Sequence, residues 1–371
     1  MKQVYIIDYI RTPIAKFQGG LSEVRADDLA AIVLKEIVKR NPQIPAEEIE
    51  DVILGCANQA GEDNRNVARM ASLLAELPIK IGGETVNRLC ASGMAAIANA
   101  YRAIAIGEGD FYIAGGVEQM TRAPYVLSKS AQPFGRDVQL FDSSFGWRFI
   151  NPKMKELYGV DGMGETAENL VEIYKISREA QDEFALHSQQ KATSAQNSGR
   201  LAQEIVNVEV PQKKGEPKIF SEDEFVKPDT TLDKLAKLRP AFKKEGGSVT
   251  AGNSSGLNDG AAAMILASED AVKKYNLKPL AKIISSAVVG VEPRIMGIGP
   301  VEATKKALSR ANLSLEDMDI IELNEAFAAQ ALSVLQELGI DAKDERLNPN
   351  GGAIALGHPL GMSGTRIVGT A

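Results

Sequence analysis

Short apolar runs alternate with helix-like segments along the first part of the chain. The runs Val4–Ile10 and Val52–Leu54 are typical of strands, and a helical pattern begins between them after Arg25–Asp27. The alternation continues with a strand at 84–87, a helix from about Cys90 to Ile106 and a strand at 111–114. This βαβ order predicts parallel strands that are joined by crossover helices.

The length of 371 residues exceeds the size at which a single hydrophobic core stops growing, so we expect two or three domains. Hydrophobic residues make up 44% of the chain and aromatic residues only 5%, and there are 33 glycines. Small side chains, as in the run Ala261–Ala263, favour closely packed layers of helix on sheet over a β-sandwich. The predicted fold class is therefore α/β.

The chain divides into two halves around a segment of different composition. Residues 121–245 are rich in Pro, Lys, Glu and Gln and contain few strand-like runs, which predicts an inserted lobe of helices and loops. Apolar runs return at Ala261–Ala267, Ala281–Val291 and Ile320–Leu323. We therefore expect residues 1–120 with 246–270 to form one half, and residues 271–371 to form the second.

Charge and composition argue against several classes of function. The net charge of −7 and the pI near 5.2 disfavour nucleic-acid binding. The apolar start is too short for a signal peptide and no apolar run should span a bilayer, so we expect a cytoplasmic protein without a membrane partner. Two cysteines, Cys56 and Cys90, with only two histidines argue against a disulfide framework and against a metal site.

Cys90 follows a predicted strand and opens a predicted helix. Unpaired backbone N–H groups and the helix dipole favour the thiolate at such a position, which predicts a lowered pKa and a role as a nucleophile. The alternative is that Cys90 is a small buried residue that packs the helix against the sheet, as most free cysteines do. Position alone gives both interpretations about equal weight.

His358 lies in the glycine-rich segment Gly351–Gly361, where the backbone can approach a ligand closely. Pro359 suits the first turn of a helix, so His358 is either a ligand-facing group at a helix start or a capping residue in a turn. The segments Cys90–Met94 and His358–Met362 resemble each other, which suggests equivalent helix starts in two similar halves. The other histidine, His187, is interpreted as a packing or solvated residue within a helix.

Asn324 follows the predicted strand Ile320–Leu323, at the end where open α/β sheets place ligand groups. Its amide suits a water molecule or an oxyanion, but Asn is also a common helix cap. The Gly/Ser loop Ser248–Gly260 suits hydrogen bonding to an amide-rich ligand and lacks the lysine of a phosphate-binding loop. Gly115–Gly116 is interpreted as a turn only.

Together, the segments Asn87–Met94, Thr250–Asp259, Asn324–Phe327 and Gly351–Gly364 resemble the thiolase family along nearly the whole chain. The resemblance implies a five-layered α-β-α-β-α core of two similar halves. It also implies an inserted lobe that covers the pantetheine of CoA, and a homodimer or homotetramer. CoA and acyl-CoA are then the partners as substrates, with no permanently bound cofactor.

The resemblance also assigns roles to individual residues. Cys90 matches the cysteine that accepts the acyl group, His358 the histidine that activates it, and Asn324 the asparagine that holds a water molecule. The positions that match residues along the CoA arm are Met163, Lys227, Phe242, Ala251, Ser255 and Phe327. Two of the family's frequent residues differ, because Gly162 stands in place of a pocket histidine and Lys227 in place of an arginine that faces the nucleotide.

Two further segments, Cys56–Met70 and Gly146–Pro152, resemble the degradative branch that acts on 3-oxoadipyl-CoA. The expected reaction is reversible, CoA-dependent cleavage of a 3-oxoacyl-CoA to acetyl-CoA and a shortened acyl-CoA; the alternative within the family is a biosynthetic, acetoacetyl-CoA-forming enzyme. Thiolases also carry a second cysteine in a Cys-x-Gly segment, which we do not find in residues 1–371. If that segment is absent from the natural protein, we expect an impaired thiolase-like protein that binds CoA or lipid. A decarboxylating ketoacyl synthase needs a second active-site histidine or asparagine, and His187 is badly placed for it.

Overall fold

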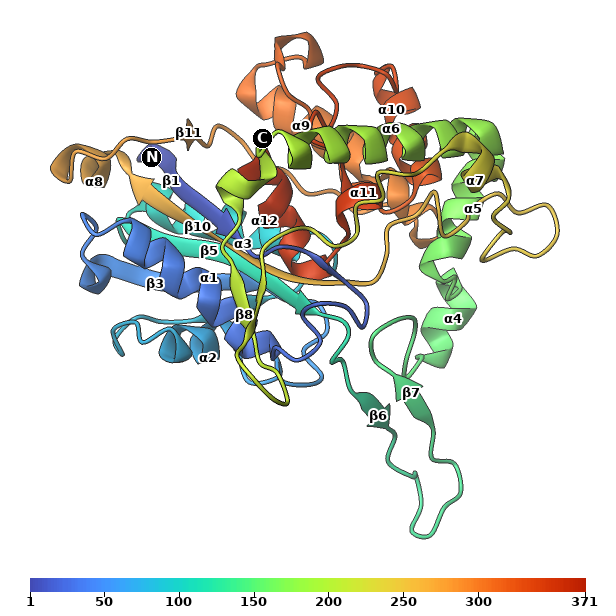
Figure 1. Cartoon of the computed structure of the whole chain (residues 1–371), viewed down its shortest axis with the longest axis horizontal. Coiled ribbons are helices and arrows are strands. Elements are labelled where there is room, and N and C mark those ends of the chain that lie inside the picture. Colours follow the sequence, from blue (N-terminus) through green and yellow to red (C-terminus); the bar gives the residue numbers. More distant parts are fainter.

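The computed structural model describes residues 1–371, and its centre is a mixed sheet of seven strands (Figure 1). The strands lie in the order β11 (Ala281–Lys282), β1 (Val4–Arg11), β10 (Asn258–Ser268), β5 (Phe111–Gln119), β3 (Ile49–Gly55) and β4 (Glu84–Val86), and β2 (Ala15–Lys16) pairs with β10. β3 runs parallel to β4 and β5, as expected, but β10 is antiparallel to both of its long neighbours. The sheet is therefore not the purely parallel one that the βαβ order predicts.

Helices cover both faces of this sheet. On one face α1 (Ala26–Arg40) and α2 (Val67–Leu74) pack in a core with Ile113 of β5, and on the other α3 (Ser92–Ile106) and α12 (Leu360–Thr370) pack in a core with Ala114. Successive residues of a strand point to opposite faces. Every residue of β5 and β10 is buried, which explains why their sequences are mainly apolar or small, with polar residues at the ends Glu118–Gln119 and Asn258–Asp259.

The segment 121–245 contains helices, loops and two short hairpins, as its composition predicts. Its elements are β6 (Tyr125–Leu127), β7 (Leu140–Asp142), α4 (Pro152–Tyr158), α5 (Met163–Tyr174), α6 (Arg178–Asn197), β8 (Val208–Val210), β9 (Lys218–Phe220) and α7 (Leu232–Ala236). The hairpin β6–β7 extends away from the rest of the molecule, and α5 and α6 lie beside the C-terminal helices (Figure 1).

The last part of the chain is helical. It contains α8 (Glu269–Lys274), α9 (Gly299–Ala311), α10 (Ala328–Leu338), α11 (Ala353–Leu356) and α12. The expected strands at Ala281–Val291 and Ile320–Leu323 are not formed, apart from β11 and a single bridge between Ile321 and Leu347. A strand needs a continuous ladder of N–H and C=O groups, and these two segments pair with β1 and with residues 346–348 only over short stretches.

One helix is long and apolar enough to cross a membrane by length and composition, contrary to the expectation that no such run exists. The apolar stretch is the window Leu89–Ile106, which includes α3. Its mean hydropathy is 1.3, and 56% of its residues are buried. The reason is its place in the fold, because α3 packs against the sheet on one side and against α12 on another. A core helix that is surrounded in this way is apolar on most of its faces.

Candidate active site

Cys90 lies in a tight loop between β4 and α3. Leu89, directly before it, has a φ of 48°, a left-handed conformation that is unusual for a bulky side chain. Ser92 holds the loop, since its Oγ donates to Leu89 O at 2.6 Å and accepts from Arg88 N at 2.8 Å. Cys90 is thereby fixed two residues before the first residue of α3.

Burial and, to a smaller extent, the charge of the nearby Glu118 carboxylate raise the pKa of the Cys90 thiol to about 11. The expectation of a lowered pKa at the helix start is therefore wrong. Loss of solvent around the thiolate and a neighbouring negative charge outweigh the favourable end of the helix dipole. Cys90 is consequently a protonated thiol at neutral pH and needs a base.

His358 is buried, two residues before the first residue of α12, so it occupies the same position relative to its helix as Cys90 does. Its Nδ1 lies 2.6 Å from Ser363 Oγ, and Ser363 Oγ lies 2.9 Å from Pro359 O. A carbonyl only accepts, so Ser363 donates to Pro359 and His358 Nδ1 donates to Ser363. The hydrogen-bond network thus assigns the tautomer in which Nε2 keeps its lone pair.

The pKa of His358 is lowered to about 4, first by burial and then by the positive charge of Arg366. The imidazole is therefore neutral at neutral pH. A neutral ring with a lone pair on Nε2 is able to accept a proton, which is the property that a protonated thiol requires of its partner.

Asn324 lies beside His358, with Nδ2 at 3.3 Å from His358 Nε2. The amide nitrogen donates to the lone pair, while Asn324 Oδ1 is buried and has no hydrogen-bond partner in the protein. An unpartnered buried acceptor of this kind suits the O–H of a water molecule or a ligand. The helix-cap alternative is wrong, because α10 begins only at Ala328 and Phe327 is its N-cap.

The starts of α3 and α12 meet over the carboxyl ends of β3 and β5. A Cβ on Gly361 would lie 2.4 Å from Val117 O and 2.6 Å from Gly55 O, and a Cβ on Gly93 would lie 2.8 Å from Gly361 O. Only glycine leaves room for backbones to approach this closely. The Cys90 loop and the His358 loop therefore share one end of the sheet, as two similar halves predict.

Glu118, near the end of β5, joins the loop after β3 to the start of α12 and was not identified from the sequence. Its carboxylate accepts hydrogen bonds from Ala57 N and Asn58 N at 3.0 Å and from Gly361 N at 2.8 Å. Burial raises the pKa of Glu118 to about 7, although the three N–H donors oppose this shift. The sequence signal that could have identified Glu118 is an acidic residue at the end of an apolar run. The predicted turn at Gly115–Gly116 is wrong, because both glycines lie within β5.

Most of the residues predicted along the CoA arm lie together. The rings of Phe242 and Phe327 meet edge to face with centroids 5.9 Å apart. Phe242 also packs on Gly164, next to Met163 at the start of α5, where a Cβ would lie 2.0 Å from the ring. Ser255 N donates to the carbonyl of the residue before Phe327 at 2.9 Å. Phe242, Phe327 and Gly164 thus form an apolar wall, and Phe327 follows Asn324 by three residues in the chain.

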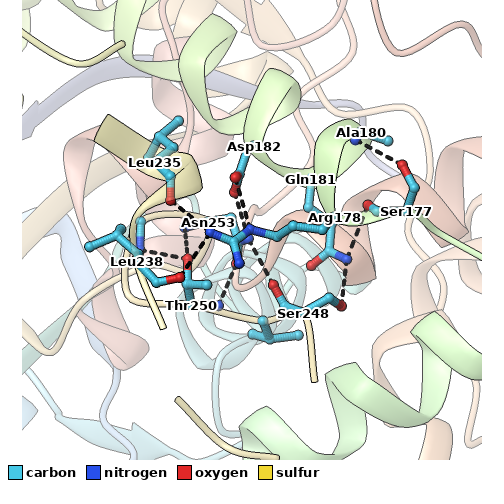
Figure 2. Close-up of polar contacts among 12 residues, drawn as sticks. Ser177, Arg178, Ala180, Gln181, Asp182, Leu235, Leu238, Ser248, Thr250 and Asn253 are labelled. Carbon is cyan, nitrogen blue, oxygen red and sulfur yellow. Dashed lines mark hydrogen bonds and ion pairs between the residues drawn. The ribbon is translucent and has the colours of Figure 1, made fainter. Parts of the chain in front are cut away.

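A buried polar network fixes the loop that carries Ala251 and Ser255 (Figure 2). Arg178 Nε donates to Asp182 Oδ2 at 2.8 Å, and Asn253 Nδ2 donates to Asp182 Oδ1 at 2.9 Å. Asn253 Oδ1 in turn accepts from Thr250 N at 2.8 Å. Ala251 itself is exposed, at the tip of this loop.

Lys227 stands apart from this group. It is exposed, its Nζ lies 4.7 Å from the centroid of the Phe225 ring, and it forms no ion pair. Its backbone N donates to Gln189 Oε1 of α6 at 2.8 Å. No hydrogen bond or ring contact joins it to Phe242 or Phe327. An exposed cation on a polar surface suits a phosphate, but the structure does not place Lys227 against the apolar wall.

Cys56, Asp63 and Glu118 form a buried cluster whose ligand atoms lie within 4.8 Å of one another. The acceptors are already used, since Glu118 has three N–H donors and Asp63 accepts from Gln59 N, Gly61 N and the Cys56 thiol. Burial and the two carboxylates raise the pKa of Cys56. These three side chains therefore form a hydrogen-bonded cluster that stabilises the loops around the active site, and their geometry is not that of a cation site.

Comparison with known proteins places this architecture in a family. Residues 4–270 match the thiolase N-terminal domain and residues 277–371 match the thiolase C-terminal domain, so the chain belongs to the thiolase family and is an acyltransferase. Among its relatives, the 3-oxoadipyl-CoA/3-oxo-5,6-dehydrosuberyl-CoA thiolase of Escherichia coli is 59% identical over 99% of this chain and 91% of its own length. The beta-ketoadipyl-CoA thiolase of Pseudomonas knackmussii is 60% identical over 100% of this chain and 92% of its own length.

The fold agrees with this assignment. The crystal structure of human mitochondrial 3-ketoacyl-CoA thiolase in complex with CoA matches with a TM-score of 0.90 and 41% identity, over 100% of this chain and 90% of that one. The predicted thiolase-like α/β fold is therefore confirmed.

Proposed function

We propose that this protein cleaves 3-oxoadipyl-CoA with CoA to give acetyl-CoA and succinyl-CoA, through an acyl group carried on Cys90. The main support for this chemistry is the pair of hydrogen bonds from His358 Nδ1 to Ser363 and from Ser363 to Pro359 O. They leave the lone pair on His358 Nε2, at the same end of the sheet as the Cys90 loop. The substrate is supported by identities of about 60% to relatives that are named for it.

The first step moves one proton and forms one bond. His358 Nε2 accepts the thiol proton of Cys90 as the sulfur attacks the 3-keto carbon. Nε2–H is then a donor, and with Asn324 Nδ2 or a water molecule on Oδ1 it stabilises the negative charge on the substrate oxygen. One group therefore acts first as the base and then as a hydrogen-bond donor.

The second step breaks the bond between carbons 2 and 3, and its electron pair leaves as the enolate of acetyl-CoA. The enolate takes up one proton at carbon 2. The family resemblance assigns this proton to the second cysteine; Cys56 does not supply it, because it is buried and its thiol is bonded to Asp63. The thiolate of an incoming CoA then attacks the acyl group and restores Cys90.

The test is a substrate panel with the full-length protein and its Cys90→Ser variant. We expect 3-oxoadipyl-CoA to give the highest kcat/KM among 3-oxoadipyl-CoA, acetoacetyl-CoA and a medium-chain 3-oxoacyl-CoA. The variant should retain its fold by circular dichroism and lose cleavage, with no acyl adduct by intact mass. If 3-oxoadipyl-CoA is the poorest substrate, the substrate assignment is wrong; cleavage by the variant at the parent rate would remove Cys90 from the mechanism.

A further inference from the structure

A substrate with a terminal carboxylate places a specific demand on the acyl pocket, and the inference below rests on the proposed function. In 3-oxoadipyl-CoA a negatively charged carboxylate lies two methylene groups beyond the keto carbon that Cys90 attacks. A carboxylate that leaves water needs an opposite charge or several hydrogen-bond donors, because an unpaired buried charge is very costly. The pocket therefore needs a cation or a group of N–H donors near the nucleophile, and a guanidinium supplies both.

The guanidinium of Arg148 has several N–H donors without a hydrogen-bond partner. It is half-buried, and its only hydrogen bond runs from Nη1 to Ser143 O at 3.3 Å. It forms no ion pair, whereas Arg25 and Arg122 are both paired with carboxylates. Arg122, for example, is held by Glu62 at 2.6 Å. A guanidinium carries five N–H donors in a planar fork that matches a carboxylate, so Arg148 keeps its capacity for a two-point interaction.

A chain of hydrogen bonds links Arg148 to the loop of the nucleophile. Ser143 O, which accepts from Arg148, also accepts from Asn58 Nδ2 at 2.9 Å. Asn58 N donates to Glu118, and the carbonyl of the residue before Asn58 accepts from Asn87 Nδ2 at 3.0 Å. Asn87 lies three residues before Cys90 in the same loop. The guanidinium is therefore attached to the structure that positions Cys90.

The neighbours of Arg148 in the sequence fix its loop from both sides. Trp147 Nε1 donates to Asp161 O at 3.1 Å, just before Gly162 and Met163 at the start of α5. The ring of Phe149 meets that of Phe141 edge to face, with centroids 5.0 Å apart. These two contacts fix the loop that carries Arg148, and the Arg148 side chain is partly shielded from water. Arg88 is nearer to Cys90 in sequence, but it is exposed to solvent.

The geometry points to Arg148 as the receptor for the terminal carboxylate of the acyl chain. It makes Arg148 a specificity-determining residue: it selects dicarboxylic 3-oxoacyl chains over neutral chains of the same length. The arginine takes no part in the proton transfers, which remain with His358.

The test compares 3-oxoadipyl-CoA with 3-oxohexanoyl-CoA, which has the same chain length and a methyl group in place of the carboxylate. We expect Arg148→Met to lower kcat/KM for 3-oxoadipyl-CoA by about 10- to 100-fold, the range of a lost charged hydrogen bond, and to leave 3-oxohexanoyl-CoA unchanged or improved. Arg148→Lys should recover part of the loss, because it restores the charge without the fork. Arg136→Met, at an exposed site in the β6–β7 hairpin, is the matched control and should change neither substrate.

Two results would overturn this proposal. An equal loss for both substrates would show that Arg148 supports the loop or the CoA phosphates, and no loss for either would place the carboxylate on another cation such as Arg88. The proposed function fails separately, in the parent protein, if 3-oxoadipyl-CoA is cleaved no better than 3-oxohexanoyl-CoA.

Discussion

The proton on His358 is fixed by a side chain that never meets the substrate. Ser363 directs it to Nδ1, and the lone pair on Nε2 follows from that choice. Proton transfer from a thiol with a pKa of about 11 to an imidazole with a pKa of about 4 is uphill in the free protein. We infer that Cys90 becomes nucleophilic only as the bond to the substrate forms, which protects the free thiol from other electrophiles.

The low pKa of His358 makes stability depend on pH. The folded-state pKa of about 4 lies below the unfolded value of about 6.5, so the native protein binds fewer protons between these values. The contribution of His358 is full above pH 6.5 and is lost as the pH falls towards 4. The free energy of unfolding should therefore fall less between pH 7 and pH 4 in His358→Gln than in the parent protein. The expected difference between the two falls is on the order of 3 kcal/mol.

Urea unfolding at a series of pH values measures this difference. The matched control is His187→Gln, which removes the other histidine, in α6, and leaves the buried His358 in place. An identical pH slope in the parent protein and in His358→Gln would contradict a buried, neutral His358.

At this scale, sequence reasoning selects the candidate reacting groups but does not predict their protonation state. Cys90, Asn324 and His358 were predictable because each follows a recognisable strand or glycine signal. The sign of the shift in the Cys90 pKa was not, because burial and the approach of Glu118 depend on chain segments that are distant in sequence. Glu118 was missed for the same reason, since its three donors come from two separate loops.

At the scale of elements, the active site depends on how closely two helix starts approach. The contacts of Gly361 with Val117 O and Gly55 O involve backbone atoms, which cannot rotate away as a side chain can. The start of α12, and with it His358, can therefore lie this close to the sheet only because Gly361 has no Cβ methyl group.

Gly361→Ala should displace α12 from the sheet. We expect a loss of about 1–3 kcal/mol in the free energy of unfolding, as is usual for overpacking, and a lower kcat because His358 moves with the helix. Urea unfolding and steady-state kinetics measure the two effects. Gly290→Ala is the control, because a Cβ there meets open space and both quantities should stay at the parent level. Parent-like kinetics in Gly361→Ala would mean that the helix contact does not position His358.

The elements themselves were largely predictable, and their pairing was not. The helix at 92–106 and the strands of the N-terminal half follow the periodicity of the sequence. The antiparallel insertion of β10 between β1 and β5 leaves no local signal, because a fully buried strand has the same composition in either direction. The extended segments near Ile284 and Ile320 have the composition of strands but pair with their neighbours only over short stretches.

At the scale of the whole molecule, one buried arginine ties the inserted segment to the sheet. Arg11, at the end of β1, donates from Nη1 and Nη2 to Asp223 at 2.7 and 2.8 Å and from Nε to Glu204 at 2.6 Å. All three side chains are almost completely buried. No local pattern in the sequence indicates such a contact, because its partners are far apart along the chain.

Arg11→Met should leave Asp223 buried without its cation, while Glu204 keeps its ion pair with Arg200 at 3.1 Å. Breaking a buried ion pair from one side costs about 3–5 kcal/mol, so we expect a loss of this order in the free energy of unfolding by urea. Faster proteolysis within residues 205–245 should accompany it. Arg102→Met, at an exposed site on α3, should stay within about 0.5 kcal/mol of the parent. A similarly small change in Arg11→Met would show that this ion pair does not hold the lobe.

The central place of β10 has a consequence for synthesis on the ribosome. β1 and β5 emerge early, but the strand that joins them is translated only after the whole inserted segment. Until residue 268 has left the exit tunnel, both strands present open, apolar edges to other nascent chains. The N-terminal half therefore completes its sheet late, and a pause or a chaperone that shields these edges during translation of 121–245 should raise the yield of native protein.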